Sequence, residues 1–109
     1  MSENADLPII DMHKIKFDPK KHIRIDRRTI FGNPYPMESE KERNLVCDQF
    51  QIHFNMLIHE DQFFRDAVWN MAILLKKGFK LACWCYSKED PKRCHAFTYL
   101  DYLKKKGLI

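Results

Sequence analysis

Three of the chain's four cysteines and one of its five histidines stand close together in the segment 83–95, CWCYSKEDPKRCH. Thiolate sulfur and imidazole nitrogen are ligands that zinc prefers, and four of them would complete a tetrahedral site. The candidate ligands are Cys83, Cys85, Cys94 and His95. Their spacing is C-x-C followed by an adjacent Cys-His pair, whereas structural zinc sites usually use a C-x₂₋₄-C knuckle. Zinc therefore stays one interpretation of the segment, and we favour no metal.

A nucleophilic thiol is the second chemistry that this segment supports. Cations such as Lys92 and Arg93 lower the pKa of a nearby thiol, and His95 could act as a base or an orienting group. The segment does not match the C-x₅-R cradle of cysteine phosphatases, because the sixth residue after Cys85 is Pro91. The candidate catalytic residues are Cys83, Cys85, Cys94 and His95. The plain alternative is that the thiols are buried and only shape the wall of a pocket.

A second group of polar residues follows the alternating segment 22–26. Arg27-Arg28 could make bidentate contacts to a phosphate or a carboxylate. Gly32-Asn33-Pro34 comes next, and it has an equally simple reading as a tight turn, because Gly and Asn tolerate left-handed dihedrals and Pro fixes the next one. The two arginines could likewise be ordinary exposed charges.

The pattern of apolar residues predicts the elements that carry these groups. Short apolar or alternating runs predict strands, and wider apolar spacing predicts helices. We expect strands at 7–12, 22–26 and 79–85, a helix that opens at a capping box over Ser39–Glu42, a second that ends at Gly78, and a last helix that opens at Asp90-Pro91. A strand joined to a later strand through helices favours parallel pairing. We therefore predict a small α/β sandwich, in which a short and mostly parallel sheet of about three strands is packed by three helices.

Parallel pairing would bring the two groups of polar residues together. Ligands of open parallel sheets bind beyond the carboxyl ends of the strands. The ends of the predicted strands 22–26 and 79–85, with the loops that follow them, would emerge there, next to the start of the last helix, where free backbone amides attract anions. The predicted ligand-binding residues are Arg27, Arg28, Gly32, Asn33, Pro34 and Trp84. Alternation along the strand sends Trp84 to the face opposite Cys83 and Cys85, so Trp84 could also be a core residue.

Length, composition and charge restrict the class of protein. The chain has 109 residues, 45% of them hydrophobic, and we expect one domain over 7–109 with a loose tail at 1–6. The net charge of +4 falls just short of the level that marks strong nucleic-acid binders. Lys76-Lys77 and Lys104–Lys106 precede glycines, and we read them as solvated helix ends that complement the helix dipole. No apolar run is long enough to span a membrane.

The compartment follows from the amino-terminal sequence and the cysteines. Residues 1–6 lack the basic and then apolar pattern of a secretory signal, so we expect a cytoplasmic protein. In a reducing compartment the four cysteines are thiols, ligands or nucleophiles rather than two disulfides.

Taken in combination, these motifs resemble a known family. An arginine followed by Gly32-Asn33-Pro34-Tyr35, then Cys83-Trp84-Cys85 and Cys94-His95, is similar to the pattern R…GNPF…CWC…P…CH of domain of unknown function 4326, a family of small phage and bacterial proteins. The resemblance covers residues 20 to 103. Tyr35 stands where Phe is commoner, and the loop 87–90 is longer than usual. The resemblance implies a phage or prophage source and a cytoplasmic setting, in the host if the gene is carried by a phage. It supplies no reaction.

Three functions remain open at this point. The first is binding of a phosphate-bearing small molecule, above all a nucleotide, at the carboxyl edge of the sheet. The second is a cysteine-dependent enzyme that acts on a nucleotide or a related metabolite. The third is a small phage protein that binds a host protein or nucleic acid. No oligomeric state is predicted.

Overall fold

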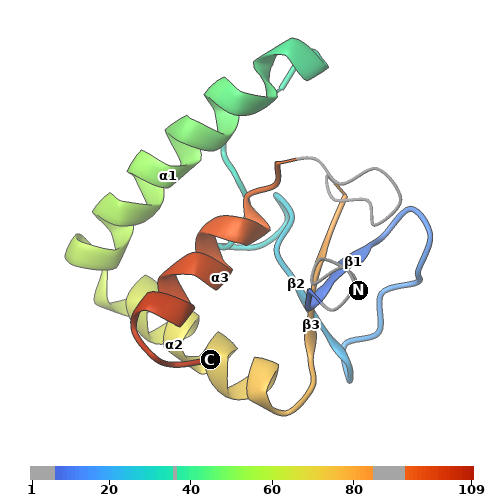
Figure 1. The fold of residues 1–109 in the computed structure, drawn as a ribbon, viewed down its shortest axis with the longest axis vertical. Helices are drawn as coiled ribbons and strands as arrows, with labels where there is room; N and C mark the ends of the chain where they lie inside the picture. The colour runs from blue at the N-terminus through green and yellow to red at the C-terminus, as the bar shows by residue number, and fades with distance from the viewer. Residues whose placement is uncertain (1–6, 36, 85–92) are drawn as a thin grey trace.

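The computed structural model describes residues 7–35, 37–84 and 93–109. Its elements are β1 (Ile9–Asp11), β2 (His22–Arg24), the 3-10 helix η2 (Glu40–Glu42), α1 (Arg43–Glu60), α2 (Gln62–Lys76), β3 (Lys80–Cys83) and α3 (Ala96–Lys105). The strands form one sheet in the order β1-β3-β2, and both outer strands run parallel to β3 (Figure 1). The predicted α/β class, with a three-stranded parallel sheet packed by three helices, is confirmed.

The sheet is short because each strand contributes only a few ladder positions. Leu81 of β3 stands between Ile9 of β1 and Ile23 of β2. Two hydrogen bonds extend the ladder past the strand ends, from the Met12 N–H to Cys83 O at 3.0 Å and from the Ile25 N–H to Ala82 O at 3.0 Å. The predicted strands are therefore in the right places but longer than those observed.

The two faces of the sheet are covered differently. All three helices pack on one face, through fully buried side chains that include Val68, Leu81 and Leu103. The other face carries Ile10, Met12 and Ala82, with Phe17 of the β1–β2 connection packed against them. The hydrophobic core therefore lies between the sheet and the helices, on the left of the sheet in Figure 1.

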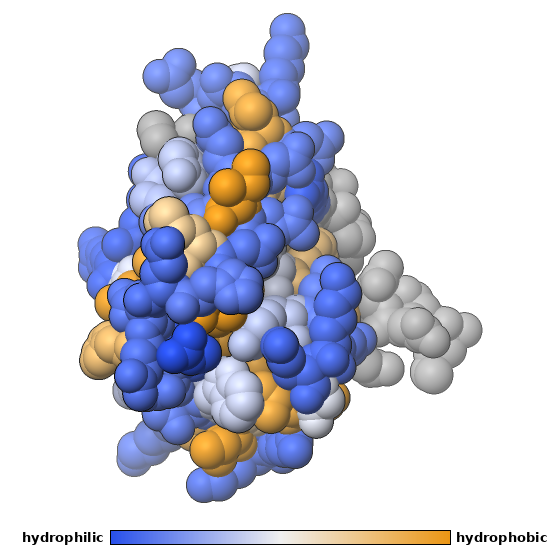
Figure 2. Space-filling view, turned by 90° about the vertical axis from the view of Figure 1, so that its left-hand side faces the viewer, coloured by the Kyte–Doolittle hydropathy of each residue, from blue (hydrophilic) through white to orange (hydrophobic). Residues whose placement is uncertain are grey.

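Helix α1 also exposes apolar side chains to solvent. Figure 2 looks onto the helical side of the molecule and shows apolar patches between polar side chains. The exposed apolar residues of α1 are Leu45, Ile52 and Met56. Among the helices that the structure describes, none is long and apolar enough to cross a lipid bilayer.

The predicted capping box before α1 is wrong. Ser39 makes no side-chain capping hydrogen bond, and residues Glu40–Glu42 wind as a 3-10 turn before α1 begins at Arg43. The carboxylate of Glu42 accepts a hydrogen bond from the Glu38 N–H at 2.8 Å. A capping box would need this carboxylate to accept from the N–H of Ser39, but it accepts from the N–H of Glu38 instead.

The last helix begins later than predicted. Its proposed start at Asp90-Pro91 lies outside the described residues, but Arg93 and Cys94 are not helical and α3 starts at Ala96. The chain here is held by long-range contacts, because the Arg93 carbonyl accepts from Arg43 Nη1 at 2.9 Å. These contacts hold the residues before Ala96 out of the helix.

Candidate functional site

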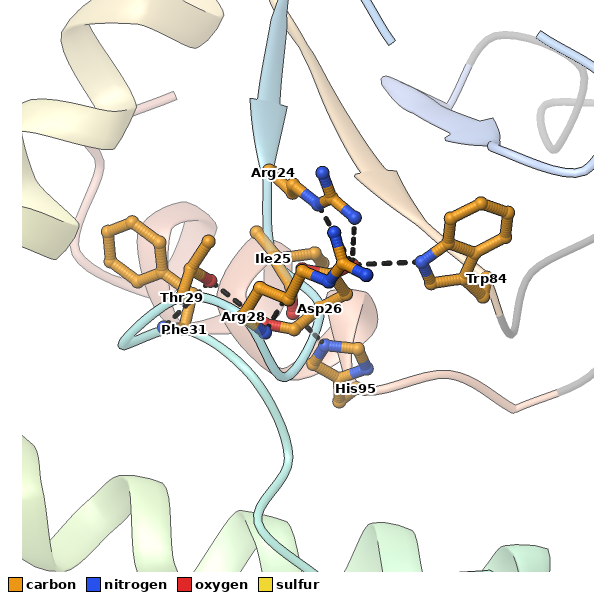
Figure 3. Close-up of polar contacts among 8 residues, drawn as sticks. All are labelled: Arg24, Ile25, Asp26, Arg28, Thr29, Phe31, Trp84 and His95. Carbon is orange, nitrogen blue, oxygen red and sulfur yellow. Dashed lines mark hydrogen bonds and ion pairs between the residues drawn. The ribbon is translucent and has the colours of Figure 1, made fainter. Parts of the chain in front are cut away.

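The carboxyl ends of β2 and β3 open onto a hollow of about 560 Å³. The start of α3 reaches the same edge, and Figure 3 shows Asp26, Trp84 and His95 grouped there. We call this space the carboxyl-edge hollow. It is lined by Asp26, Arg27, Arg28, Asn33, Tyr35, Met37, Glu40, Arg43, Val46, Cys47, Trp84, Arg93, Cys94 and His95.

The predicted site residues are brought together only in part. Those that line the hollow are Arg27, Arg28, Asn33, Trp84, Cys94 and His95. Gly32, Pro34 and Cys83 do not line it. Cys85 lies outside the described residues. The parallel pairing on which the predicted meeting of the two groups depended is observed, and the ligand-binding and catalytic roles stay predictions.

Asp26 organises the sheet side of the hollow. Its Oδ2 atom accepts from Arg24 Nε at 2.9 Å, from Arg24 Nη2 at 2.8 Å and from Trp84 Nε1 at 2.8 Å. Its Oδ1 atom accepts from the Arg28 N–H at 3.3 Å (Figure 3). Burial raises the pKa of Asp26, but these hydrogen bonds and the charge of Arg24 outweigh that effect and hold the pKa below its ordinary value. Asp26 is thus ionised at neutral pH, and its carboxylate is held in one position by its donors.

Trp84 presents a fixed aromatic surface at the edge of the hollow. The residue is 46% exposed, whereas Cys83 before it is fully buried, as strand alternation predicts. Its ring nitrogen is engaged by Asp26, and the His13 ring packs edge-on against the indole with centroids 4.9 Å apart. A large aromatic ring is therefore held in one orientation while nearly half of it faces solvent.

Gly32 is required by a close approach of two backbone segments. A Cβ atom at this position would lie 2.4 Å from Asp26 O and 2.6 Å from Arg27 Cα. The turn is further fixed at Thr29, whose hydroxyl donates to Asp26 O at 3.0 Å. Burial raises the pKa of Tyr99 well above its ordinary value, and its protonated hydroxyl donates to Phe31 O at 2.7 Å. Gly32 thus positions the lining residues without lining the hollow itself.

Asn33 ties the same loop to α1. Its Oδ1 atom accepts from the Tyr35 N–H at 2.9 Å, and its Nδ2 atom donates to Val46 O at 3.3 Å. Both ends of the amide are therefore engaged by backbone groups. The tight-turn interpretation predicted left-handed dihedrals at Gly32 and Asn33, and this is wrong, because neither residue has a positive φ. The close approach at Gly32 and the amide contacts of Asn33 fix the loop instead.

The arginines of the hollow differ in how far they are engaged. Arg27 Nη2 donates to Tyr35 O at 3.2 Å, and Arg93 forms an ion pair with Asp48 at 2.6 Å. Arg28 is exposed, and its guanidinium makes no hydrogen bond or ion pair with any described residue. Within the part of the chain that the structure describes, the Arg28 guanidinium is therefore available to an anion.

Arg43 is a lining residue that the sequence analysis missed. Its guanidinium donates to both carboxylate oxygens of Glu40, at 2.7 and 2.8 Å, and to Arg93 O. The i,i+3 spacing from Glu40 is a local signal that the sequence contains. The contact with Arg93 joins residues 50 positions apart, and no local sequence pattern predicts it.

His95 is a buried and neutral imidazole. Its Nε2 atom lies 2.6 Å from Ile25 O, and because a carbonyl can only accept, Nε2 carries the proton. Burial lowers the pKa of His95. The hydrogen bond to Ile25 and the charges of Cys83 and Asp26 raise it by less, so the pKa lies below its ordinary value. The lone pair of the neutral ring is then on Nδ1, which lies 3.8 Å from Cys94 Sγ.

The described thiols are all buried. Cys83 Sγ and Cys94 Sγ are 3.4 Å apart, and the two residues are 0% and 2% exposed. Burial also raises the pKa of the Cys47 thiol, although Arg93 and Arg43 counter it. Within residues 7–35, 37–84 and 93–109, no three His, Cys, Asp or Glu side chains gather in a way that would hold a metal ion. A zinc site that includes Cys85 stays a prediction.

Comparison with known proteins identifies the family. The family model described as Domain of unknown function (DUF4326) matches residues 10–105, and the chain belongs to this family. The resemblance seen in the motifs is thus confirmed. No curated protein and no solved structure matches the chain.

Proposed function

We propose that this member of the DUF4326 family binds a phosphate-bearing small molecule, above all a nucleotide, in the carboxyl-edge hollow. One observation carries the proposal: a single hollow joins Arg28, whose guanidinium has no described partner, to the fixed and half-exposed ring of Trp84. Its volume of about 560 Å³ falls within the range of about 300–1,000 Å³ that is usual for small-molecule sites.

The phosphate would be held by arginine rather than by the start of α3. The first amides of that helix are already engaged, because the Ala96 N–H lies 3.5 Å from Cys94 Sγ and the Phe97 N–H donates to Cys94 O at 3.0 Å. The Arg28 guanidinium is exposed and offers a planar fork of donors that suits phosphate. Arg27 stands next to it at the rim and retains donors beyond the one given to Tyr35.

The aromatic part of the ligand would stack on Trp84. Stacking of a nucleobase on an aromatic side chain contributes about 1–3 kcal/mol and suits every base, because each has a π-face. Asp26 and His13 already hold the indole, so little side-chain entropy is lost when a base packs against it. A flat ring and a phosphate in one molecule are the features of a nucleotide.

A single-tryptophan variant tests this proposal. The chain has two tryptophans, and in a Trp69→Phe background only Trp84 reports binding. We expect nucleoside monophosphates to quench its fluorescence saturably, nucleosides to do so more weakly, and inorganic phosphate to compete without quenching. Arg28→Gln should weaken nucleotide binding at least about tenfold, whereas Lys105→Gln, which removes one exposed charge at the far end of α3, should not. A fluorescence and melting temperature indifferent to every nucleotide and to phosphate would refute the proposal.

We also place this activity in the cytoplasm, in the host cell where the gene is carried by a phage. The resemblance to small phage and bacterial proteins supports this setting. Fractionation of expressing cells checks it, and recovery of the protein outside the cytoplasmic fraction would contradict it.

A cysteine-dependent enzyme is the second candidate, and one observation favours it. Cys94 lines the hollow, and its Sγ atom lies 3.8 Å from the Nδ1 atom of His95. If Cys94 is a nucleophile, iodoacetamide should alkylate it faster than Cys47, and a bound nucleotide should protect it. Equal and slow alkylation of all the cysteines in the native protein, Cys83, Cys85 and Cys94 included, would exclude this candidate.

A further inference from the structure

A second charged surface lies at the opposite, amino edge of the sheet. Four exposed lysines from two distant parts of the chain surround a hollow of about 310 Å³: Lys20, Lys21, Lys77 and Lys80. We call this surface the lysine groove. Its other lining residues are Ile10, Ile15, His22, Gly78 and Phe79, so none of the carboxylates that the structure describes lines it.

The sheet register brings these lysines together. His22 of β2 is the partner of Lys80 of β3, and the Lys80 N–H donates to Lys21 O at 3.1 Å. Lys77 follows the last turn of α2 and reaches the groove because Gly78, with φ +98°, reverses the chain into β3. In Figure 1 the end of α2 and the start of β3 lie beside the chain that enters β2.

The net charge of the segments that form the groove equals that of the whole chain. Segments 18–22 and 76–80 contain five lysines and one aspartate, a net charge of +4, and the complete chain also carries +4. The remaining residues therefore carry no net charge. The net positive charge of this protein thus equals that of these two segments at the amino edge of the sheet.

The charges of the four groove lysines are not neutralised by any residue that the structure describes. None of the four groove lysines forms an ion pair or a side-chain hydrogen bond with a described residue. Asp18 is the acidic residue nearest in sequence, and its Oδ1 atom is engaged by the Lys20 N–H at 3.0 Å. Like charges gathered around one hollow repel one another, and an anion that covers the groove would relieve this repulsion.

We propose that the lysine groove binds the phosphodiester backbone of a nucleic acid strand without sequence preference. Exposed lysines release counterions when they meet phosphates, and this term supplies nearly all of non-specific nucleic-acid binding. Protein interfaces are instead depleted in lysine and enriched in arginine and large aromatic residues, which the groove lacks apart from Phe79. An acidic protein is therefore the less fitting partner. The groove lies at the far edge of the sheet from the carboxyl-edge hollow, so the two sites act separately.

Fluorescence anisotropy with a labelled oligonucleotide of about 20 nucleotides, single-stranded and duplex, tests the proposal in about 50 mM KCl and above. We expect affinity to fall steeply with salt, with a log–log slope that drops by about one for each lysine removed. The triple variant K21Q/K77Q/K80Q should bind at least about tenfold more weakly. The matched control K104Q/K105Q/K106Q removes the same charge from the end of α3 and should bind as the wild type does.

Three outcomes would overturn the proposal. They are an equal loss in both triple variants, no binding at low salt, and competition by poly-glutamate as effective as that of DNA of equal charge, which would indicate an acidic protein partner. The double variant K20Q/K21Q, in the β1–β2 connection, replaces the triple variant if that one melts early. The triple variant K21Q/K77Q/K80Q should leave the quenching of Trp84 by nucleoside monophosphates unchanged, because none of these lysines lines the carboxyl-edge hollow, so failure here is distinguishable from failure of the nucleotide site.

Discussion

The two edges of the same parallel sheet use their charges in opposite ways. At the carboxyl edge, Asp26 is held by several donors, and the loop above it is locked at Gly32 and Asn33. At the amino edge, Lys21 and Lys80 are joined by a backbone hydrogen bond and line one groove, and neither side chain has a described counter-ion. The charged and polar residues of the carboxyl edge are therefore hydrogen-bonded within the fold, whereas the lysines of the amino edge are exposed on its surface. Substitutions should reduce stability at the first edge and change only binding at the second.

Gly32→Ala should have the largest effect on stability. The new methyl group would meet backbone atoms at 2.4 and 2.6 Å, and backbone cannot move aside as a flexible side chain can. Overpacking of this kind costs about 1–3 kcal/mol, and we expect the upper end in urea denaturation. Gly78→Ala is the control, because its Cβ would meet nothing within 4 Å and only its φ of +98° opposes the change. Equal losses in the two variants would show that the close approach is not a constraint.

Asp26→Asn should have the next largest effect on stability. The amide can still accept from Trp84 but no longer carries the charge that pairs with Arg24. We expect a loss of about 1–3 kcal/mol, together with a weaker near-ultraviolet signal from the less restrained indole. The exposed Asp66→Asn on α2 is the matched control. An unchanged free energy of unfolding would mean that Asp26 does not organise this edge.

Acid should weaken the carboxyl edge before it affects the amino edge. The folded-state pKa of His95 is lowered, so its neutral form stabilises the fold above the ordinary pKa of histidine, and this contribution falls as the pH drops below about 6.5. Asp26 adds a second loss at lower pH, below about 4, because its folded-state pKa is also lowered. Urea denaturation between about pH 7.5 and pH 5.5 should show falling stability that is flatter in His95→Gln than in the control His59→Gln. Parallel curves for all three proteins would contradict a neutral His95.

Tyr99→Phe should have a smaller effect. It removes the hydroxyl that donates to Phe31 O at 2.7 Å and leaves a carbonyl of the loop above Asp26 without that partner. A lost neutral hydrogen bond of this type costs about 1 kcal/mol. Tyr102→Phe, which loses only a partly exposed contact with Trp69, should cost less. Thermal melts of the two variants measure the difference, and a reversed order would show that α3 does not support the loop.

The sequence predicted the carboxyl edge better than the amino edge. Strand periodicity and the helices between the strands predicted parallel pairing, and parallel pairing alone places Arg28, Trp84 and His95 at one edge. The contact of Arg43 with Arg93 and the steric role of Gly32 were not predictable, because they depend on backbones that meet only in three dimensions.

The same limit explains the lysine groove. Lys76-Lys77 was interpreted as a helix end, which is correct locally, but no local pattern shows that Lys21 and Lys80 are neighbours. The lysines of the groove come from two segments that are far apart in the sequence. Their charges lie close together only because β2 pairs with β3, and neither segment shows this pairing by itself.

The smallest effect on stability is expected for K20Q/K21Q at the amino edge. Whether this variant is more or less stable than the wild type decides whether the lysines are structural. In K20Q/K21Q no hydrogen bond or ion pair with a described residue is lost, and the repulsion between Lys21 and Lys80 is relieved. We therefore expect an unchanged or slightly higher urea midpoint at low salt. Added KCl screens exposed charges, so it should raise the stability of the wild type more than that of the variant. A clear loss of stability in K20Q/K21Q that salt does not change would mean that these lysines are structural, and the contrast between the two edges would fail.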